Sequence, residues 1–304
     1  MAVISAETEN SSSKKVQITK EIGRSLWQDA WHRLAKNKLA LACMIVFSFY
    51  IVVSLLVAFG ILGATWSTTV GESYAAPDWN HWFGLDIFGR DVLMKALVGT
   101  QVAMSVGLVT VMISVPIGLL LGGISGYFGG VVDEIIVWFC SIISSIPSIM
   151  LLITVTFILG RGIFAIYLAL GLTSWVGLCR MIRGEVLKHK NRDYVLAIDA
   201  LGGSHRRKLF THILPNVFHI VIIDASLTFQ MAIKSEVILS YLGLGVQDLP
   251  SWGKMIDDSK LELARGVWWQ LGAATLFMFL ILLSLNFLGD LLRDALDPKL
   301  RGQE

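Results

Sequence analysis

The sequence predicts an all-α integral membrane protein with six transmembrane helices. The 304-residue chain is 55% hydrophobic and 16% charged, which leaves too little charged surface for an ordinary soluble domain. Five long uncharged stretches each approach or exceed the ~20 residues that a helix needs to cross about 30 Å of hydrocarbon. Lysine and arginine are also divided unevenly between the segments that join these stretches. We therefore expect the chain to lie in a bilayer, where a helix satisfies its backbone hydrogen bonds internally.

The spans can be placed in order along the chain. The uncharged stretches cover residues 39–71, 96–132, 135–160, 162–179 and 266–289, and a sixth apolar stretch, 213–239, contains charges. They predict transmembrane helices at 40–62, 100–124, 135–159, 163–183, 214–238 and 268–290. Pro116 and Pro147 fall inside the second and third helices, where proline removes a backbone hydrogen bond and is expected to produce a bend. Such a bend either moves during function or only shapes the helix.

The basic residues predict the orientation of the chain. Eighteen of the 25 lysines and arginines lie in the termini and the loop after the fourth span, six lie in the opposite loops, and Lys234 lies inside a span. Because short cytoplasmic loops are enriched in Lys and Arg, both termini and that loop are expected in the cytoplasm. We therefore expect a multi-pass protein of the cell inner, or cytoplasmic, membrane.

Four regions follow from this topology. Residues 1–38 form a cytoplasmic tail, and its first dozen residues are polar, are expected to be disordered and lack the apolar start of a signal peptide. Residues 39–99 hold the first span and an external segment, residues 100–292 form the core transmembrane domain with a cytoplasmic loop at 185–212, and residues 293–304 form a C-terminal tail.

The external side carries two further predictions. Asp86 and Arg90 stand four residues apart, which predicts a short helix that is N-capped by Asp86 and stabilised by that pair. Six tryptophans on this side are expected to form an interfacial aromatic belt or a protein-docking surface. They are Trp66, Trp79, Trp82, Trp252, Trp268 and Trp269.

The cytoplasmic loop contains a short segment that predicts a protein contact. Tyr194, Ala197, Ile198 and Leu201 recur at helical spacing and predict one apolar stripe, on a helix that Gly202 and Gly203 end. Ala197, Ala200 and Gly202 have a methyl side chain or none, so that a partner's backbone can approach closely. We call residues 193–204 the docking knob.

Three cations follow the docking knob. Ser204 is a predicted N-cap, and it is followed by Arg206, Arg207 and Lys208 on the first turn of the helix that leads into the fifth span. The helix dipole disfavours cations at that position. Either an acidic partner or anionic lipid compensates for them, or the positive-inside rule alone explains them.

Several motifs resemble one known family. Ala197 and Gly202, followed thirteen residues after Gly202 by Pro215, resemble the cytoplasmic "EAA" coupling loop of ABC importer permeases. Leu196 and Ile198 depart from that pattern, which has Glu and a second Ala there, and Asp199 is the nearest acidic replacement. Four other motifs resemble the dipeptide, oligopeptide and nickel permease family, in which Leu85 is usually Thr. They are Phe83–Asp91, Gly126–Gly130, Leu239–Gly245 with Ser251–Gly253, and Gly289–Pro298.

The resemblance implies a type I ABC importer permease fold and a composite machine. Its partners would be a homologous second permease, two ATP-binding subunits, an external solute-binding protein and membrane lipid, with no nucleic acid. ATP and Mg are expected in the partner subunits and no cofactor on this chain, because Gly253 and Lys254 are followed by Met255 and make no nucleotide loop. This chain would be a transporter subunit and not an enzyme. The residues expected to couple it to an ATPase are Tyr194, Ala197, Asp199, Ala200, Leu201, Gly202, Ser204, Arg206, Arg207 and Pro215.

The fifth span carries polar residues that suggest a translocation path. Each charge there costs at least ~2.5 kcal/mol if it faces lipid, so Asp224, Lys234 and Glu236 are expected to face protein or water. The path residues would be Gln230, Lys234, Glu236 and Ser240; internal pairing or snorkelling explains the charges equally well. The alternative function is a secondary transporter or channel that uses Asp224, Lys234 and Glu236 as an ion relay.

The remaining candidate residues predict no catalytic or metal site. Cys43, Cys140 and Cys179 lack metal-ligand spacing and are expected to be small apolar fillers. His205, His212 and His219 recur every seven residues but lack converging carboxylates, which argues against a metal. The substrate stays open among peptides, nickel, opines and sugar-related solutes.

Overall fold

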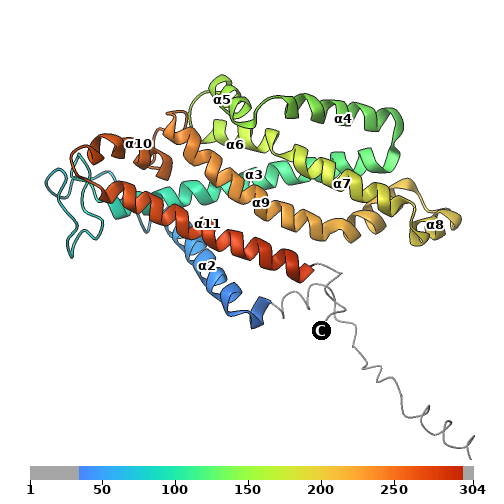
Figure 1. Ribbon diagram of the computed structural model, residues 1–304, viewed down its shortest axis with the longest axis horizontal. Helices are drawn as coiled ribbons and strands as arrows, with labels where there is room; N and C mark the ends of the chain where they lie inside the picture. The colour runs from blue at the N-terminus through green and yellow to red at the C-terminus, as the bar shows by residue number, and fades with distance from the viewer. Residues whose placement is uncertain (1–33, 297–304) are drawn as a thin grey trace, which may run out of the picture.

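The computed structural model describes residues 34–296, and no β-strand lies among them, although Leu85 and Asp91 form an isolated antiparallel bridge. Figure 1 shows long helices running roughly along the long axis, with α8 at one end and α10 beside the α2–α3 loop at the other. We call these the α8 end and the α10 end. The helices are α2 (Lys38–Ala58), α3 (Val92–Phe128), α4 (Gly130–Ser145), α5 (Ser148–Leu159), α6 (Ile163–Thr173), α7 (Trp175–Lys190), α8 (Asp193–Ala200), the π-helix η1 (Arg207–Ile213), α9 (Leu214–Tyr241), α10 (Trp252–Leu263) and α11 (Trp269–Leu296).

Five helical stretches in residues 34–296 are long and apolar enough to cross a membrane. They are α2, α3, Ile163–Lys190, Arg207–Tyr241 and Trp269–Ala295. A sixth span requires α4 and α5 together, and these are bent by 91° at Pro147. The predicted all-helical membrane fold is confirmed, and so is the predicted bend at Pro147, because a proline that follows Ile146 in extended geometry cannot continue the helix. The third span expected at 135–159 is therefore divided into α4 and α5. At Pro116, in contrast, α3 continues as one helix.

The central helix, α3, packs against α7 through a row of glycines. Gly118, Gly122 and Gly126 recur every four residues and so lie on one face. A Cβ atom on Gly118 would lie 2.9 Å from the Trp175 carbonyl oxygen, and one on Gly126 would lie 2.7 Å from the Arg183 carbonyl oxygen. This spacing is the small-residue pattern that lets membrane helices approach closely. α3 also contacts α2, α6 and α9, so the row holds α7 against the centre of the bundle.

Replacing Gly122 with Ala is expected to destabilise this contact. The new Cβ would press on the backbone carbonyl of Cys179, which cannot move aside as a side chain can. Overpacking of this kind costs about 1–3 kcal/mol. Gly123→Ala is the matched control. Its Cβ would lie 3.2 Å from the end of the Leu214 side chain, which can move aside, and alanine also has a higher helix propensity than glycine. Thermal unfolding in detergent should show a lower midpoint for Gly122→Ala alone; equal midpoints would contradict the glycine contact.

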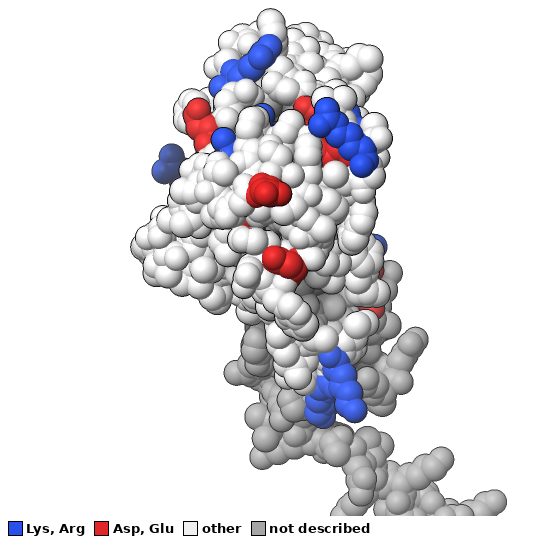
Figure 2. Space-filling model, turned by 90° about the vertical axis from the view of Figure 1, so that its left-hand side faces the viewer, with Lys and Arg blue, Asp and Glu red and all other residues white. Residues whose placement is uncertain are grey.

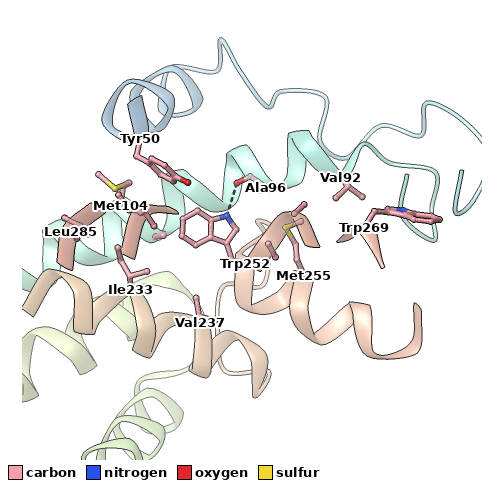
Figure 3. Close-up of a cluster of buried hydrophobic side chains, with 14 of the residues drawn as sticks. Tyr50, Val92, Ala96, Met104, Ile233, Val237, Trp252, Met255, Trp269 and Leu285 are labelled. Atoms are coloured by element: carbon pink, nitrogen blue, oxygen red, sulfur yellow. Dashed lines mark hydrogen bonds between the residues drawn. The ribbon is translucent and has the colours of Figure 1, made fainter. Parts of the chain in front are cut away.

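A hydrophobic core near the α10 end joins α2, α3, α9, α10 and α11 (Figure 3). Trp252 is fully buried at its centre and donates from its indole nitrogen to the carbonyl of Ala96, 3.0 Å away. Tyr50 donates to the carbonyl of Phe277 at 2.7 Å and links α2 to α11. Trp269 is also buried, and it donates to the carbonyl of Leu85. The predicted aromatic belt is therefore wrong for Trp252 and Trp269, whose N–H groups are satisfied inside the protein.

The loop between α2 and α3 contains a tight turn instead of the predicted short helix. One carboxylate oxygen of Asp86 accepts from the backbone N–H groups of Phe88 and Arg90, at 2.8 and 2.9 Å. The other accepts from the ammonium of Lys95, and Arg90 lies over the ring of Phe88. Asp86 thus caps a turn, and its ionic partner is Lys95 and not Arg90. α3 begins at Val92, so it crosses the boundary expected at residue 99.

The three cysteines are free and buried. The sulfurs of Cys140 on α4 and Cys179 on α7 lie 3.8 Å apart, and both residues belong to a small apolar cluster with Trp175 and Val176. Their position between packed helices matches the expected filling role.

Candidate functional site

The docking knob forms at the α8 end from α8 and the turn that follows it. α8 ends at Ala200, and Gly202 adopts a left-handed backbone with φ of 74°. The amide of Gly203 donates to the carbonyl of Ile198, and the amide of Gly202 donates to the carbonyl of Asp199, both at 2.9 Å. This is the glycine stop that the sequence predicts, because a left-handed residue closes the last carbonyls of a helix.

The apolar side chains of the docking knob divide between two faces. Val195 is buried, and Tyr194 and Ile198 are half-buried against the rest of the chain. Leu196 is 54% exposed and Leu201 is 87% exposed. Exposed Ala197 and Ala200 lie beside these two leucines in the sequence. The single stripe predicted from Tyr194, Ala197, Ile198 and Leu201 is therefore wrong: its members Tyr194 and Ile198 anchor the helix, while the exposed members and Leu196 form a small apolar surface.

Hydrogen bonds attach the docking knob to other helices. The Tyr194 hydroxyl and the His189 Nδ1 atom, at the end of α7, lie 2.8 Å apart. The Tyr127 hydroxyl, near the end of α3, lies 2.8 Å from the Nδ1 atom of His205, just after the knob. A force on α8 would therefore reach both α3 and α7, which the glycine row already packs together.

An ion pair closes the docking knob onto η1. Lys208 is buried and its ammonium binds the Asp199 carboxylate, which is 63% exposed. The Lys208 hydrogen bond and charge lower the pKa of Asp199, so this carboxylate is charged at neutral pH. The sequence places three adjacent cations together, but the structure separates them: Arg206 and Arg207 are exposed, whereas Lys208 faces inward. Asp199 thus has a partner within the chain.

The segment after the docking knob leads directly into α9, the span that contains Asp224, Lys234 and Glu236. Ser204 accepts from the backbone N–H of Arg207 at 3.3 Å, which confirms the predicted cap. Residues Arg207–Ile213 form a π-helix, and Pro215 lies at the start of α9. Proline has no N–H to donate and crowds the preceding turn, so a widened turn before it relieves the conflict. Helical structure therefore runs without a break from the end of the docking knob through η1 into α9.

Of the four candidate path residues on α9, the structure brings Glu236 and Ser240 together and leaves Gln230 and Lys234 apart from them. Gln230 is buried and donates to the carbonyl of Leu285 on α11, 3.1 Å away. Glu236 is fully buried and accepts from Ser240 at 2.6 Å. Lys234 is exposed, and Asp224 accepts from Thr228 at 3.3 Å. Asp224, Lys234 and Glu236 form no ion pair with one another. Of the four path candidates, Lys234 is exposed and the other three are buried.

Sequence reasoning missed the residues that fasten the docking knob. Tyr127 stands in the Gly126–Gly130 motif, and its contact with His205 joins residues 78 positions apart. The Asp199–Lys208 spacing of nine residues fits no single helix, because the chain turns at Gly202 between them. The one available signal was that an acid, Asp199, is separated from a basic run by two adjacent glycines.

The chain is similar to known transport proteins over nearly its whole length. Residues 114–302 match the family model of binding-protein-dependent transport system inner membrane components, and residues 25–69 match the N-terminal TM domain of oligopeptide transport permease C. The dipeptide transport system permease protein DppC of Bacillus subtilis is 37% identical over 95% of this chain and 91% of its own length. The oligopeptide transport system permease protein OppC of Haemophilus influenzae is 38% identical over 91% and 90%. The protein of that name in Escherichia coli is 36% identical over 97% of both chains.

Proposed function

This chain belongs to the family of binding-protein-dependent transport system inner membrane components, and we propose that it is the permease subunit of an ATP-driven importer of short peptides or related solutes. The observation that carries the coupling role is the docking knob: a small exposed apolar surface, fixed by hydrogen bonds and an ion pair to three membrane helices. The peptide substrate is inferred from the names of the relatives, which are dipeptide and oligopeptide permeases.

In this proposal the docking knob fits a groove on an ATP-binding subunit. Leu196 and Leu201 supply the apolar contact, and the small residues Ala197, Ala200 and Gly202 let the partner backbone approach. Arg206 and Arg207 lie at the edge of the contact, where they can bind acidic side chains. Closure of two such subunits around ATP and Mg would push α8 and tilt α3, α7 and α9 together. Nucleotide and solute must then favour different conformations of the permease.

The assembly contains this chain, a homologous second permease, two ATP-binding subunits and an external solute-binding protein. The docking knob must face the cytoplasm, where ATP is present. The positive-inside distribution supports that orientation and puts both termini on the same side, which leaves the α10 end facing outward. This chain would hydrolyse nothing itself, and selectivity would depend largely on the external binding protein.

The alternative is a secondary transporter or channel that relays ions through Asp224, Lys234 and Glu236. A relay needs groups that can exchange protons or ions in sequence. Glu236 is covered by the chain's own helices and bonded to Ser240, and the three charges make no ion pair with one another. The geometry therefore favours the ATP-driven importer.

The proposal is tested by purifying the tagged protein from its native membranes in mild detergent. We expect an ATP-binding subunit and a second permease to co-purify, and the complex to hydrolyse ATP, as measured by mass spectrometry and phosphate release. Uptake in vesicles should require ATP and should persist when an uncoupler collapses the proton gradient. Recovery of this chain alone from functional membranes, with uptake abolished by the uncoupler, would favour the secondary transporter.

A further inference from the structure

A cavity of about 620 Å³ opens at the α10 end, far from the docking knob. It lies between α10, the loop that joins α2 to α3, and the first turns of α3 and α11. Figure 2 looks onto this end and shows acidic and basic side chains interspersed on it. The coupling role of the docking knob leaves this cavity unexplained. Its volume is in the range of cavities that hold a ligand or a large side chain.

The base of the cavity contains buried ionisable groups whose charges do not balance. Asp86, Lys95 and Glu262 are each at most 6% exposed. The Lys95 ammonium donates to Asp86 at 2.9 Å and to the amide oxygen of Gln270 at 2.7 Å. Two acids therefore share one cation, and that cation is directed at Asp86. The cluster carries one acid in excess.

Glu262 is the unsatisfied member. It is 2% exposed, and neither of its carboxylate oxygens has a hydrogen-bond partner, although the Ile87 backbone N–H is near enough to lower its pKa. Burial raises the pKa of Glu262 to about 7, and the charges of Asp86 and Asp258 add to this effect, while Lys95 opposes it. Buried polar groups without partners are uncommon in native proteins. A cationic donor that entered the cavity would satisfy this carboxylate.

The rim of the cavity combines exposed apolar side chains with charged ones. Leu261 is 79% exposed and Phe88 is 59% exposed, and Leu249 and Pro250 lie beside them in the lining. Apolar rim side chains above an acidic base match a long basic side chain, which has an apolar stem and a charged tip. The other basic side chains of the cavity have contacts of their own or lie at its mouth. Arg90 stacks over Phe88 and Trp66, although its buried Nε atom has no hydrogen-bond partner. Lys260 binds Asp257, and Lys254 is exposed.

We propose that this cavity receives a lysine or arginine side chain of the external solute-binding protein, whose ammonium or guanidinium donates to Glu262. The proposal rests on the proposed function, because it requires an external partner and an outward-facing α10 end. A bare metal ion fits less well, since no group of three potential ligands comes together in residues 34–296. Binding of the partner would convert the surplus acid into a buried ion pair, so an incorrect partner without the basic side chain would leave Glu262 unpaired.

The first test compares two variants of the complete importer reconstituted in lipid nanodiscs. The probe is the solute-binding protein that stimulates ATP hydrolysis by the wild-type complex. Glu262→Gln keeps the shape and removes the charge, and it should weaken binding of the probe by at least about tenfold. Glu72→Gln makes the same chemical change at an exposed residue outside the cavity and should change binding less than twofold. Basal ATP hydrolysis should be unchanged in both variants.

A second test identifies the inserted side chain. A photo-crosslinking residue at Leu261 should attach to a segment of the probe that contains a lysine or arginine. Replacing that basic residue of the probe by Gln should weaken its binding to the wild-type importer about as much as Glu262→Gln weakens binding of the unchanged probe. Combining the probe variant with the Glu262→Gln importer should weaken binding no further. Additive losses would overturn the pairing.

The remaining outcomes separate the two proposals. Unchanged binding of the probe to Glu262→Gln, with wild-type stimulation intact, would overturn this inference and leave the importer function standing. An altered solute requirement at unchanged probe affinity would also overturn it, because the cavity would then contact the solute's own amine. A wild-type complex that no solute-binding protein stimulates would overturn the proposed function itself.

Discussion

Replacing Gly202 with Asp is expected to abolish solute uptake while leaving the protein in the membrane. Gly202 has a left-handed backbone, which Asp tolerates better than most residues, and no atom lies within 4 Å of its Cβ position. The folded chain therefore has room for the side chain. In the proposed contact with the ATP-binding subunit, however, the carboxylate would be buried without a partner, at a cost of roughly 3–5 kcal/mol of docking. Uptake into vesicles, corrected for the amount of inserted protein, measures the effect.

Gly202→Asn provides the matched control. Asn has the same size and the same tolerance of the left-handed backbone but carries no charge, so it should retain much more uptake and subunit binding than Asp. Co-purification of the ATP-binding subunit separates lost docking from lost folding. Normal uptake by Gly202→Asp would contradict the assignment of the docking knob as the coupling site.

Replacing Lys95 with Met is expected to destabilise the α10 end strongly. Lys95 is 6% exposed and bonds Asp86 and Gln270, so its loss leaves the buried Asp86 carboxylate without its cation and the Gln270 amide oxygen without its donor. Removing one member of a buried ion pair typically costs about 3–5 kcal/mol. The midpoint of thermal unfolding in detergent should fall well below that of the wild type.

Two controls test whether charge is the cause. Lys254→Met makes the same substitution on an exposed residue of α10 and should shift stability by no more than about 0.5 kcal/mol. Adding Asp86→Asn to Lys95→Met removes the stranded charge and keeps the oxygen that accepts from Phe88 and Arg90, so stability should partly recover. A double variant as unstable as Lys95→Met would show that packing, and not charge, dominates.

The candidate site could be located from the sequence but not oriented. Its position, its glycine stop at Gly202 and the cap at Ser204 all depend on residues within a few positions of one another. Which side chains of α8 face outward depends on where α7 and α3 lie, and the helical spacing of Tyr194 and Ile198 does not show that these two face the rest of the chain. The inward position of Lys208 depends on the turn that brings it back to Asp199.

By itself the sequence determined that this is a helical membrane protein, where most of its spans lie, and where a short helix between two glycines and the end of the fourth span forms the docking knob. Span length, hydropathy and helix ends are local properties, because each depends on a stretch of about 20 residues or fewer. The tertiary structure alone decided that Trp252 lies in the core against Ala96, and that Lys95 is paired with Gln270, 175 residues away. These features arise from packing between distant segments, and hydropathy does not reveal which segments become neighbours once all of them are buried in lipid.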